Sequence, residues 1–294
     1  RSRRQRQMCI RDSYRTPHSF EGPIRDTLWY SKEDWPKVEQ AQAAKITLQD
    51  QQVGRLLEKL ESINELDNTI VLYTSDNGAH FNHDNVNGHQ LEFFDSNGNL
   101  RGGKRDLYEG GLRVPLIISG PGIKKGKNHN FAFVTDIAAT LSDIVFDNVD
   151  ERIVGKSLQS SLAGSEEKNY LDSDSVGLEV TGNSALFKGD FKIVKNRPPN
   201  GSNQWELFNL SEDPGETINL ATSMPNKLQE LIKEYEAYAE ENGVIELPLD
   251  YEWAAEMTIN TFKRNYLPLI WKAAFFIILA LSLVVVLVRR WRNS

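Results

Sequence analysis

An apolar run that ends in a small polar cluster constrains the fold of this chain more than any other feature. Residues 69–74, T-I-V-L-Y-T, are rich in β-branched and aromatic side chains, and Ser75, Asp76, Asn77 and Gly78 follow directly. Such an apolar run is typical of a buried parallel strand, and ligands bind just beyond the carboxyl ends of these strands in open α/β sheets. Asp76 and Asn77 would then present adjacent oxygen ligands, which suit Ca²⁺ or Mg²⁺. Because the same tetrapeptide also suits an ordinary turn, this segment alone leaves both interpretations open.

The hydrophobic pattern of the whole chain predicts a layered α/β domain followed by a small antiparallel sheet. The expected elements, in order, are a helix over 38–63, the strand 69–74, a polar loop over 78–100, a strand over 112–119, a helix over 137–145, short strands around 189–190 and 204–210, and a helix over 226–241. Strands that alternate with helices are typical of a layered α/β domain. On the first helix, residues 53, 56, 57, 60 and 63 have the spacing of one buried face.

Composition narrows the class of protein. Hydrophobic residues make up 39% and charged residues 26% of the 294 residues, enough for a core and a polar surface. The formal net charge of −7 argues against a nucleic-acid partner. Cys9 is the single cysteine, so the chain has no internal disulfide.

A second segment carries most of the remaining information. Residues 100–115 read L-R-G-G-K-R-D-L-Y-E-G-G-L-R-V-P, with Lys104 directly after two glycines. Together with T-S-D-N-G, this segment resembles the second half of the catalytic domain of the sulfatases, which are sulfate-ester hydrolases of the alkaline phosphatase superfamily. Similar stretches follow at residues 133–141, 186–194, 205–210 and 212–216, so the resemblance covers residues 14–242. It implies an alkaline-phosphatase-like layered sheet, present in part, with a small antiparallel α+β carboxy-terminal subdomain.

The resemblance also implies roles for individual residues. Asp76 and Asn77 match the metal ligands of the family, and Lys104 matches the lysine that binds the sulfate group. The implied cofactors are Ca²⁺ (or Mg²⁺) and a formylglycine made from a cysteine. His18, in T-P-H-S-F-E-G-P, resembles a histidine that contacts the sulfate ester and protonates the leaving oxygen, a role that suits a near-neutral imidazole. Phe20 stands where that family segment has a proline.

Other polar residues near these motifs receive supporting roles. We expect Glu109 and Arg113 to support the loop by ion pairing rather than to contact substrate. The histidines at 80, 83 and 89 lack the spacing of a closed zinc site, and His89 is predicted to contact substrate.

The nucleophile is a separate question, because sulfatases use a cysteine within C-x-P-x-R or C-x-A-x-R. Cys9 is followed by I-R-D-S, which has neither the proline (or alanine) nor the arginine. We therefore expect the nucleophile to be encoded upstream of this chain, and residues 1–294 alone to be inactive. Residues 1–13 contain a cluster of arginines and no signal-peptide core, and we interpret them as a non-native leader rather than a basic localisation patch.

The carboxy-terminal region predicts a membrane anchor. Residues 267–288 would reach about 33 Å as a helix, enough to cross a hydrocarbon core of about 30 Å. Trp271 and Trp291 flank the segment, and arginines follow it. The positive-inside rule then places the catalytic domain on the extracytoplasmic side, periplasmic or extracellular. The predicted organisation is a leader (1–13), a partial catalytic domain (14–152), a carboxy-terminal subdomain (153–250), a linker (251–266), a transmembrane helix in the lipid bilayer (267–288) and a basic tail (289–294).

The predicted function is metal-dependent hydrolysis of sulfate esters, with an aryl or carbohydrate sulfate as substrate. One alternative is a phosphodiesterase or phosphonate hydrolase of the same superfamily, which would share the metal ligands. Another is a non-catalytic, membrane-anchored module that binds sulfated glycans. The identity of the nucleophile, or its absence, would distinguish these three functions.

Overall fold

The computed structural model describes residues 27–79, 90–248, 250–251 and 253–292. The chain divides into two compact units, Arg1–Val244 and Ile245–Ser294. We describe each unit by itself. The boundary predicted at residue 153 lies inside the first unit and stays a prediction.

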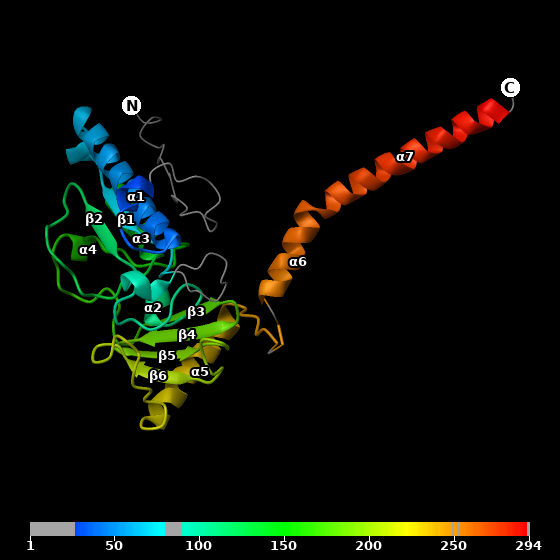
Figure 1. Ribbon diagram of the computed structural model, residues 1–294. Coiled ribbons are helices and arrows are strands. Elements are labelled where there is room, and N and C mark those ends of the chain that lie inside the picture. The colour runs from blue at the N-terminus through cyan, green and yellow to red at the C-terminus, as the bar shows by residue number, and fades with distance from the viewer. Residues whose placement is uncertain (1–26, 80–89, 249, 252, 293–294) are drawn as a thin grey trace. The chain divides into compact units, whose positions relative to one another are not determined.

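The amino-terminal part of the first unit is a mixture of short and long elements (Figure 1). They are η1 (Thr27–Tyr30), α1 (Lys37–Ser62), η2 (Leu66–Asn68), β1 (Val71–Thr74), η4 (Leu91–Phe94), α2 (Glu109–Leu112), β2 (Leu116–Ser119), α3 (Asp136–Phe146) and α4 (Gln159–Leu162). The helices predicted over 38–63 and 137–145 therefore form within a residue of the expected ends. Pro36 precedes α1 and Asn64, with φ +54°, follows it, so residues of suitable backbone geometry bound this helix.

The buried part of α1 differs from the expectation. Ala43 and Ala44 are buried near its amino-terminal end, whereas Leu56 is 57% exposed and Ile63 is 48% exposed. The prediction of a buried face through residues 53–63 is wrong for the described part of the chain. Helical spacing fixes which side chains share a face, but it does not fix whether another element covers that face.

β1 and β2 pair antiparallel, with Val71 opposite Ser119 and Thr74 opposite Leu116. The expectation of a parallel strand is therefore wrong for this pair, because a short apolar run reads the same in either orientation. β2 also begins later than residue 112, since α2 occupies Glu109–Leu112. As a result, the segment after Thr74 lies beside the segment before Leu116.

The carboxy-terminal part of the first unit is a four-stranded antiparallel sheet with one long helix. Its strands are β3 (Ser175–Val180), β4 (Asn183–Lys188), β5 (Phe191–Lys195) and β6 (Glu206–Asn209), in that spatial order, and the helix is α5 (Pro225–Glu241). Thr181 and Gly182 both have positive φ in the β3–β4 turn, as a tight two-residue hairpin requires. This sheet and helix match the predicted antiparallel subdomain.

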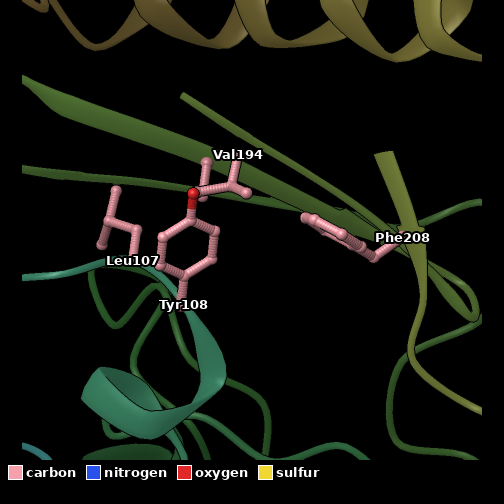
Figure 2. Packing of buried hydrophobic residues seen from close by; sticks show 5 residues of the cluster. Leu107, Tyr108, Val194 and Phe208 are labelled. Atoms are coloured by element: carbon pink, nitrogen blue, oxygen red, sulfur yellow. The ribbon is translucent and has the colours of Figure 1, made fainter. Parts of the chain in front are cut away.

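Alternating side chains bury both faces of this sheet. On one face, Leu186, Ile193 and Leu207 pack against Leu231 and Tyr235 of α5. On the opposite face, a second cluster joins the sheet to the residues just before α2. Figure 2 shows Leu107 and Tyr108 beside Val194 and Phe208 in this second cluster. The first unit is thus an α/β structure with antiparallel sheets, and the four-stranded sheet supports the segment that leads into α2.

The second unit contains α6 (Trp253–Asn265) and α7 (Leu267–Arg292). α7 covers the predicted segment 267–288, and large apolar side chains such as Phe275 and Phe276 are exposed on it. Among the described residues, we find no helix that combines the length and the apolar character required to cross a membrane. The structure therefore does not support the predicted transmembrane helix or its contact with a lipid bilayer.

Candidate functional site

Backbone hydrogen bonds bring the two sequence motifs together. The Gly78 amide donates to the carbonyl oxygen of Gly111 over 2.9 Å, and the Lys104 amide donates to the carbonyl oxygen of Ala79 over 2.7 Å. The first contact follows from the strand pairing, because Gly78 comes shortly after β1 and α2 comes shortly before β2. Asp76 and Asn77 therefore lie on a segment that is bonded directly to the turn that carries Lys104.

Glycines allow these backbones to approach closely. A Cβ atom on Gly78 would lie 1.8 Å from the carbonyl oxygen of Gly110. A Cβ on Gly110 would lie 2.3 Å from the carbonyl oxygen of Gly102, and one on Gly111 would lie 2.4 Å from that of Gly103. No residue with a side chain fits at these positions without a backbone shift. The G-G-K and E-G-G segments thus form one tightly packed unit with the loop after β1.

Two polar side chains fix the turn that carries Lys104. Asp106 is buried and accepts a hydrogen bond from the Gly103 amide over 3.2 Å. Asn97 accepts a hydrogen bond from the Ala79 amide over 3.4 Å, and its Nδ2 donates to the carbonyl oxygen of Gly102. Asn97 therefore connects the loop after β1 to the glycines before Lys104. The turn is held in shape by its own backbone and by these two residues.

The predicted ligand side chains remain accessible beside this closely packed backbone. Asp76 is exposed, and Asn77 and Lys104 are half-buried. Within the described residues, neither the Asp76 carboxylate nor the Lys104 ammonium group has an ion-pair or hydrogen-bond partner. Asn77 Nδ2 donates to the carbonyl oxygen of Gly78 over 2.9 Å, and the carboxamide oxygen is an acceptor by its chemistry. Two oxygen-bearing groups and one cationic group thus stay at least partly accessible to solvent on these two bonded segments.

The oxygen groups fit a hard divalent cation in type but not in number. Among the residues that the structure describes, no group of three or more His, Cys, Asp and Glu side chains is arranged to hold a metal ion. Ca²⁺ takes about six to eight oxygen ligands, so Asp76 and Asn77 would form only part of such a site. The remaining predicted site residues, His18 and His89, lie outside the described residues, as does Cys9.

A buried ion cluster holds the start of α2. Arg113 Nε lies 2.7 Å from Glu109 Oε2, and Lys192 Nζ lies 2.9 Å from Glu109 Oε1. The same ammonium group lies 2.8 Å from Glu216 Oε1, while Glu216 Oε2 accepts the Glu109 amide over 2.6 Å. Burial raises the pKa of Glu216 above its usual value, and the charge of Lys192 opposes that shift. The contact between Glu109 and Arg113 is therefore one part of a larger cluster.

A second cluster fixes the residue before α2. The Tyr108 hydroxyl donates to Glu206 Oε2, and the Arg101 guanidinium lies over the Tyr108 ring, 3.8 Å from its centroid. Arg101 also pairs with Glu206 Oε1 over 3.3 Å. Burial, followed by the hydrogen bond to Glu206, raises the pKa of Tyr108 well above its usual range. Tyr108 therefore stays neutral and keeps donating to Glu206 across the ordinary pH range.

Asparagine side chains from the four-stranded sheet and its loops complete the support. Asn183 Nδ2 donates to the carbonyl oxygen of Arg105 over 2.9 Å, and Asn196 Oδ1 accepts the Leu107 amide over 3.1 Å. Asn200 Nδ2 donates to Asp106 Oδ1 over 2.8 Å. The carboxy-terminal sheet thus supports the segment 101–113 along most of its length.

Several of these supporting residues were not singled out by sequence reasoning. Among those that it missed are Asn97, Asp106, Asn183, Lys192, Asn196, Glu206 and Glu216. The sequence does contain one indication at Lys192. In an alternating strand, Lys192 lies on the same face as Val194, and that face carries apolar residues. A lysine between apolar neighbours suggests a buried ionic partner, but the sequence does not identify that partner.

Two models of known protein families match overlapping regions of this chain. Residues 13–147 match the Sulfatase family, and residues 102–241 match the family described as N-sulphoglucosamine sulphohydrolase, C-terminal. The chain belongs to the sulfatase family. Both matched regions contain the segment 102–113, so Lys104 and α2 lie where the two family matches overlap.

Three relatives place this sulfatase chain among longer proteins. It is 30% identical over 264 residues to an uncharacterized sulfatase of Schizosaccharomyces pombe, covering 71% of this chain and 44% of the relative. It is 32% identical over 183 residues to an N-acetylglucosamine-6-O-sulfatase of Bacteroides thetaiotaomicron, covering 58% of this chain and 30% of the relative. A solved structure of a protein in complex with its substrate, D-glucosamine-2-N,6-O-disulfate, matches with 25% identity and a TM-score of 0.53, covering 74% of this chain and 43% of that protein. The chain spans less than half the length of these relatives.

Proposed function

We propose that this chain supplies the sulfate-binding part of the active site of an enzyme that hydrolyses sulfate esters of carbohydrates. The observation that carries the proposal is the bonding of the loop after β1 to the turn of Lys104, through Gly78 to Gly111 and Lys104 to Ala79. This contact joins the backbone segments that carry an accessible carboxylate, a carboxamide and an ammonium group. Membership of the sulfatase family supports the assignment of this unit to sulfate esters.

Each of these residues has a distinct proposed role. The Lys104 ammonium group neutralises the negative charge that develops on a nonbridging sulfate oxygen, from a position that the glycine-rich backbone fixes in advance. Asp76 and Asn77 would be ligands of Ca²⁺ (or Mg²⁺), which would supply Lewis-acid chemistry at the sulfate group. His18 protonates the leaving alcohol oxygen, and His89 contacts substrate; both lie outside the described residues.

The nucleophile is proposed to come from a cysteine outside residues 1–294 that is converted to formylglycine. Cys9, the one cysteine of this chain, lacks the C-x-P-x-R or C-x-A-x-R pattern. The overall reaction converts a sulfate ester and water to an alcohol and sulfate.

The substrate class is proposed from the relatives and from a hollow beside the site. One relative is an N-acetylglucosamine-6-O-sulfatase and one structural neighbour holds a sulfated glucosamine. A hollow of about 210 Å³ adjoins the Lys104 turn at Gly102, and its lining includes Glu92 and Asp95. Carboxylates at these positions can accept hydrogen bonds from sugar hydroxyl groups. A sulfated amino sugar is therefore the substrate to test first.

The test uses the full-length protein with Ca²⁺ and two substrates, 4-nitrophenyl sulfate and N-acetylglucosamine-6-sulfate. Asp76→Ala should abolish turnover, because it removes the anionic ligand, and Lys104→Ala should lower kcat by about 10²- to 10³-fold, as the loss of one preorganised donor does. Matched controls are Asp67→Ala and Lys125→Ala, which change exposed residues away from the site. Wild-type turnover in Asp76→Ala would contradict the metal assignment.

The same preparation separates the alternatives. A phosphonate hydrolase or phosphodiesterase would show a higher kcat/KM for 4-nitrophenyl phenylphosphonate or a phosphodiester than for either sulfate ester. A non-catalytic glycan-binding module would bind the sulfated sugar and turn over none of these substrates.

A further inference from the structure

Lys192 is a fully buried charge in a position that a hydrophobic residue would fill in an ordinary sheet. Its side chain has 0% exposure, and it lies on the β5 face that also carries Val194. Lysine is almost never fully buried unless it is paired, and removing an ammonium group from water costs several kcal/mol. Packing alone therefore does not explain a lysine here.

The partners of Lys192 both act on the start of α2. Lys192 Nζ pairs with Glu109 Oε1 at 2.9 Å and with Glu216 Oε1 at 2.8 Å. Glu109 is the first residue of α2, and its amide donates to Glu216 Oε2. Glu109 is therefore held through both its side chain and its backbone by one cluster that is centred on Lys192.

A short series of contacts leads from this cluster to the proposed ligand residues. Gly110 follows Glu109, and its amide donates to the carbonyl oxygen of Arg101 over 2.7 Å. This hydrogen bond joins the two ends of the segment 101–110, which contains Lys104. Gly111 comes next, and its carbonyl oxygen accepts the Gly78 amide, adjacent to Asn77. A shift of Glu109 would therefore move the Lys104 turn and the loop after β1 together.

The charge balance makes Lys192 essential to this arrangement. Within the described cluster, Glu109 and Glu216 are both buried, whereas the second cation, Arg113, has a side chain that is 50% exposed. Without Lys192, two buried carboxylates would face each other with no buried cation between them, and their repulsion would move Glu109 away from Glu216.

We propose that Lys192 is a positioning residue for the sulfate-binding unit, so that the carboxy-terminal sheet sets the position of Lys104 and of the Asp76–Asn77 loop. This inference rests on the proposed function of that unit. Lys192 acts through Glu109 and Glu216, and does not contact the substrate itself.

The experiment compares three variants of the full-length protein. Lys192→Met removes the buried cation, and the double variant Lys192→Met/Glu216→Gln removes one cation and one anion together, so that the buried charge stays balanced. The control is Lys188→Met, which removes a lysine that is 19% exposed on the neighbouring strand β4 and pairs with Glu234, away from α2. For each variant we would measure Tm, kcat and KM for 4-nitrophenyl sulfate, and the binding of inorganic sulfate by calorimetry.

Lys192→Met should lower kcat and weaken sulfate binding by about 10²-fold, the loss expected when catalytic groups are displaced by about 1 Å. The double variant should recover Tm but neither kcat nor sulfate binding, because no cation then ties Glu109 to β5. Lys188→Met should lower Tm at most and leave sulfate binding unchanged.

Two outcomes would overturn the proposal. One is a folded Lys192→Met variant with wild-type kcat and wild-type sulfate binding. The other is a double variant with these wild-type properties, which decides the question if Lys192→Met does not fold. If the wild-type protein hydrolyses no sulfate ester, the proposed function fails, and calorimetry with inorganic sulfate still tests the role of Lys192.

Discussion

At the scale of single residues, glycines determine how closely the loop after β1 and the segment 102–111 approach each other. Gly78, Gly110 and Gly111 place carbonyl oxygens where a Cβ atom would otherwise lie. The Gly78–Gly111 hydrogen bond and the Lys104 turn both depend on this close contact. The positions of the proposed ligand residues therefore depend on glycines, which carry no functional group.

Gly78→Ala should disrupt the site. The added Cβ would lie 1.8 Å from the Gly110 carbonyl oxygen, so one of the two segments must move. We expect a loss of about 1 to 3 kcal/mol in the free energy of unfolding, as for other overpacked sites, together with a loss of turnover. Urea denaturation and the sulfate-ester assay measure these effects. The control is Gly54→Ala, where a Cβ meets nothing within 4 Å and alanine favours the helix by about 1 kcal/mol. Equal stability changes in the two variants would contradict the close packing.

The sequence predicts the candidate ligand residues better than the residues that hold them. Asp76, Asn77 and Lys104 belong to contiguous motifs, so their residue types and spacing are readable along the chain. Lys192 and Glu216 are distant from Glu109 in the sequence and meet it only in the folded chain. A single sequence contains no record of such long-range ion pairs. The roles proposed for His18 and His89 stay predictions, because both residues lie outside the described part of the chain.

At the scale of elements, local pattern predicts the ends of helices and the sheet hairpins, but not strand orientation. The helix expected over 226–241 forms as Pro225–Glu241, and Gly189 with positive φ marks the β4–β5 turn. The apolar run at 69–74 predicts a parallel strand, whereas β1 pairs antiparallel with β2, since side chains alternate in the same way in both kinds of strand. α2 was not predicted, because two glycines disfavour a helix. Contacts from Glu216 and Tyr108 stabilise it instead.

The packing of α5 on the four-stranded sheet should depend on pH in the alkaline range. Burial raises the pKa of Tyr235 from 10.0 to about 12, and its hydroxyl donates to Ser184 Oγ over 2.9 Å. Between these two values the unfolded chain loses the phenolic proton while the folded chain keeps it. The free energy of unfolding should therefore fall as pH rises from about 10 to about 12, by up to about 1.4 kcal/mol per pH unit from this group.

Tyr235→Phe removes this titration and should make the fall of stability with pH less steep, while Tyr108, whose pKa is also raised, continues to contribute. Urea denaturation at several pH values from 9 to 12 would measure the change of slope. Tyr73→Phe, at a residue that is 40% exposed on β1, is the control for removal of a phenolic hydroxyl away from α5. An unchanged slope in Tyr235→Phe would contradict the assignment.

At the scale of the whole molecule, the described first unit joins two family regions through one shared segment. The two matched regions overlap over residues 102–147, and the overlap begins at the glycines that precede Lys104. Side chains of the four-stranded sheet support that segment, and the loop after β1, which carries the proposed metal ligands, is hydrogen-bonded to it. The proposed site is therefore divided between parts of the chain that are far apart in sequence.

Residues 1–294 expressed alone should not hydrolyse sulfate esters. The sequence contains no C-x-P-x-R or C-x-A-x-R motif, and Asp76 and Asn77 offer two oxygen groups where Ca²⁺ takes about six to eight. The purified chain would be incubated with 4-nitrophenyl sulfate and Ca²⁺, beside the full-length protein prepared in the same way. Turnover by the chain alone would mean that its nucleophile lies within these residues, and Cys9 or a serine would have to be reconsidered.

The two sheets in the described part of the first unit differ in a way that affects how often their hydrogen bonds open. β1 and β2 contribute four residues each to a two-stranded ribbon, whereas the four-stranded sheet is packed on both faces. Short ribbons with few buried contacts open locally at a low free-energy cost, and packed central strands open only with global unfolding. Amide protons of β1 should therefore exchange with solvent deuterium well before those of β4 and β5. The loop of Asp76 and Asn77 begins where β1 ends, so the proposed ligand residues are attached to the more rapidly opening sheet.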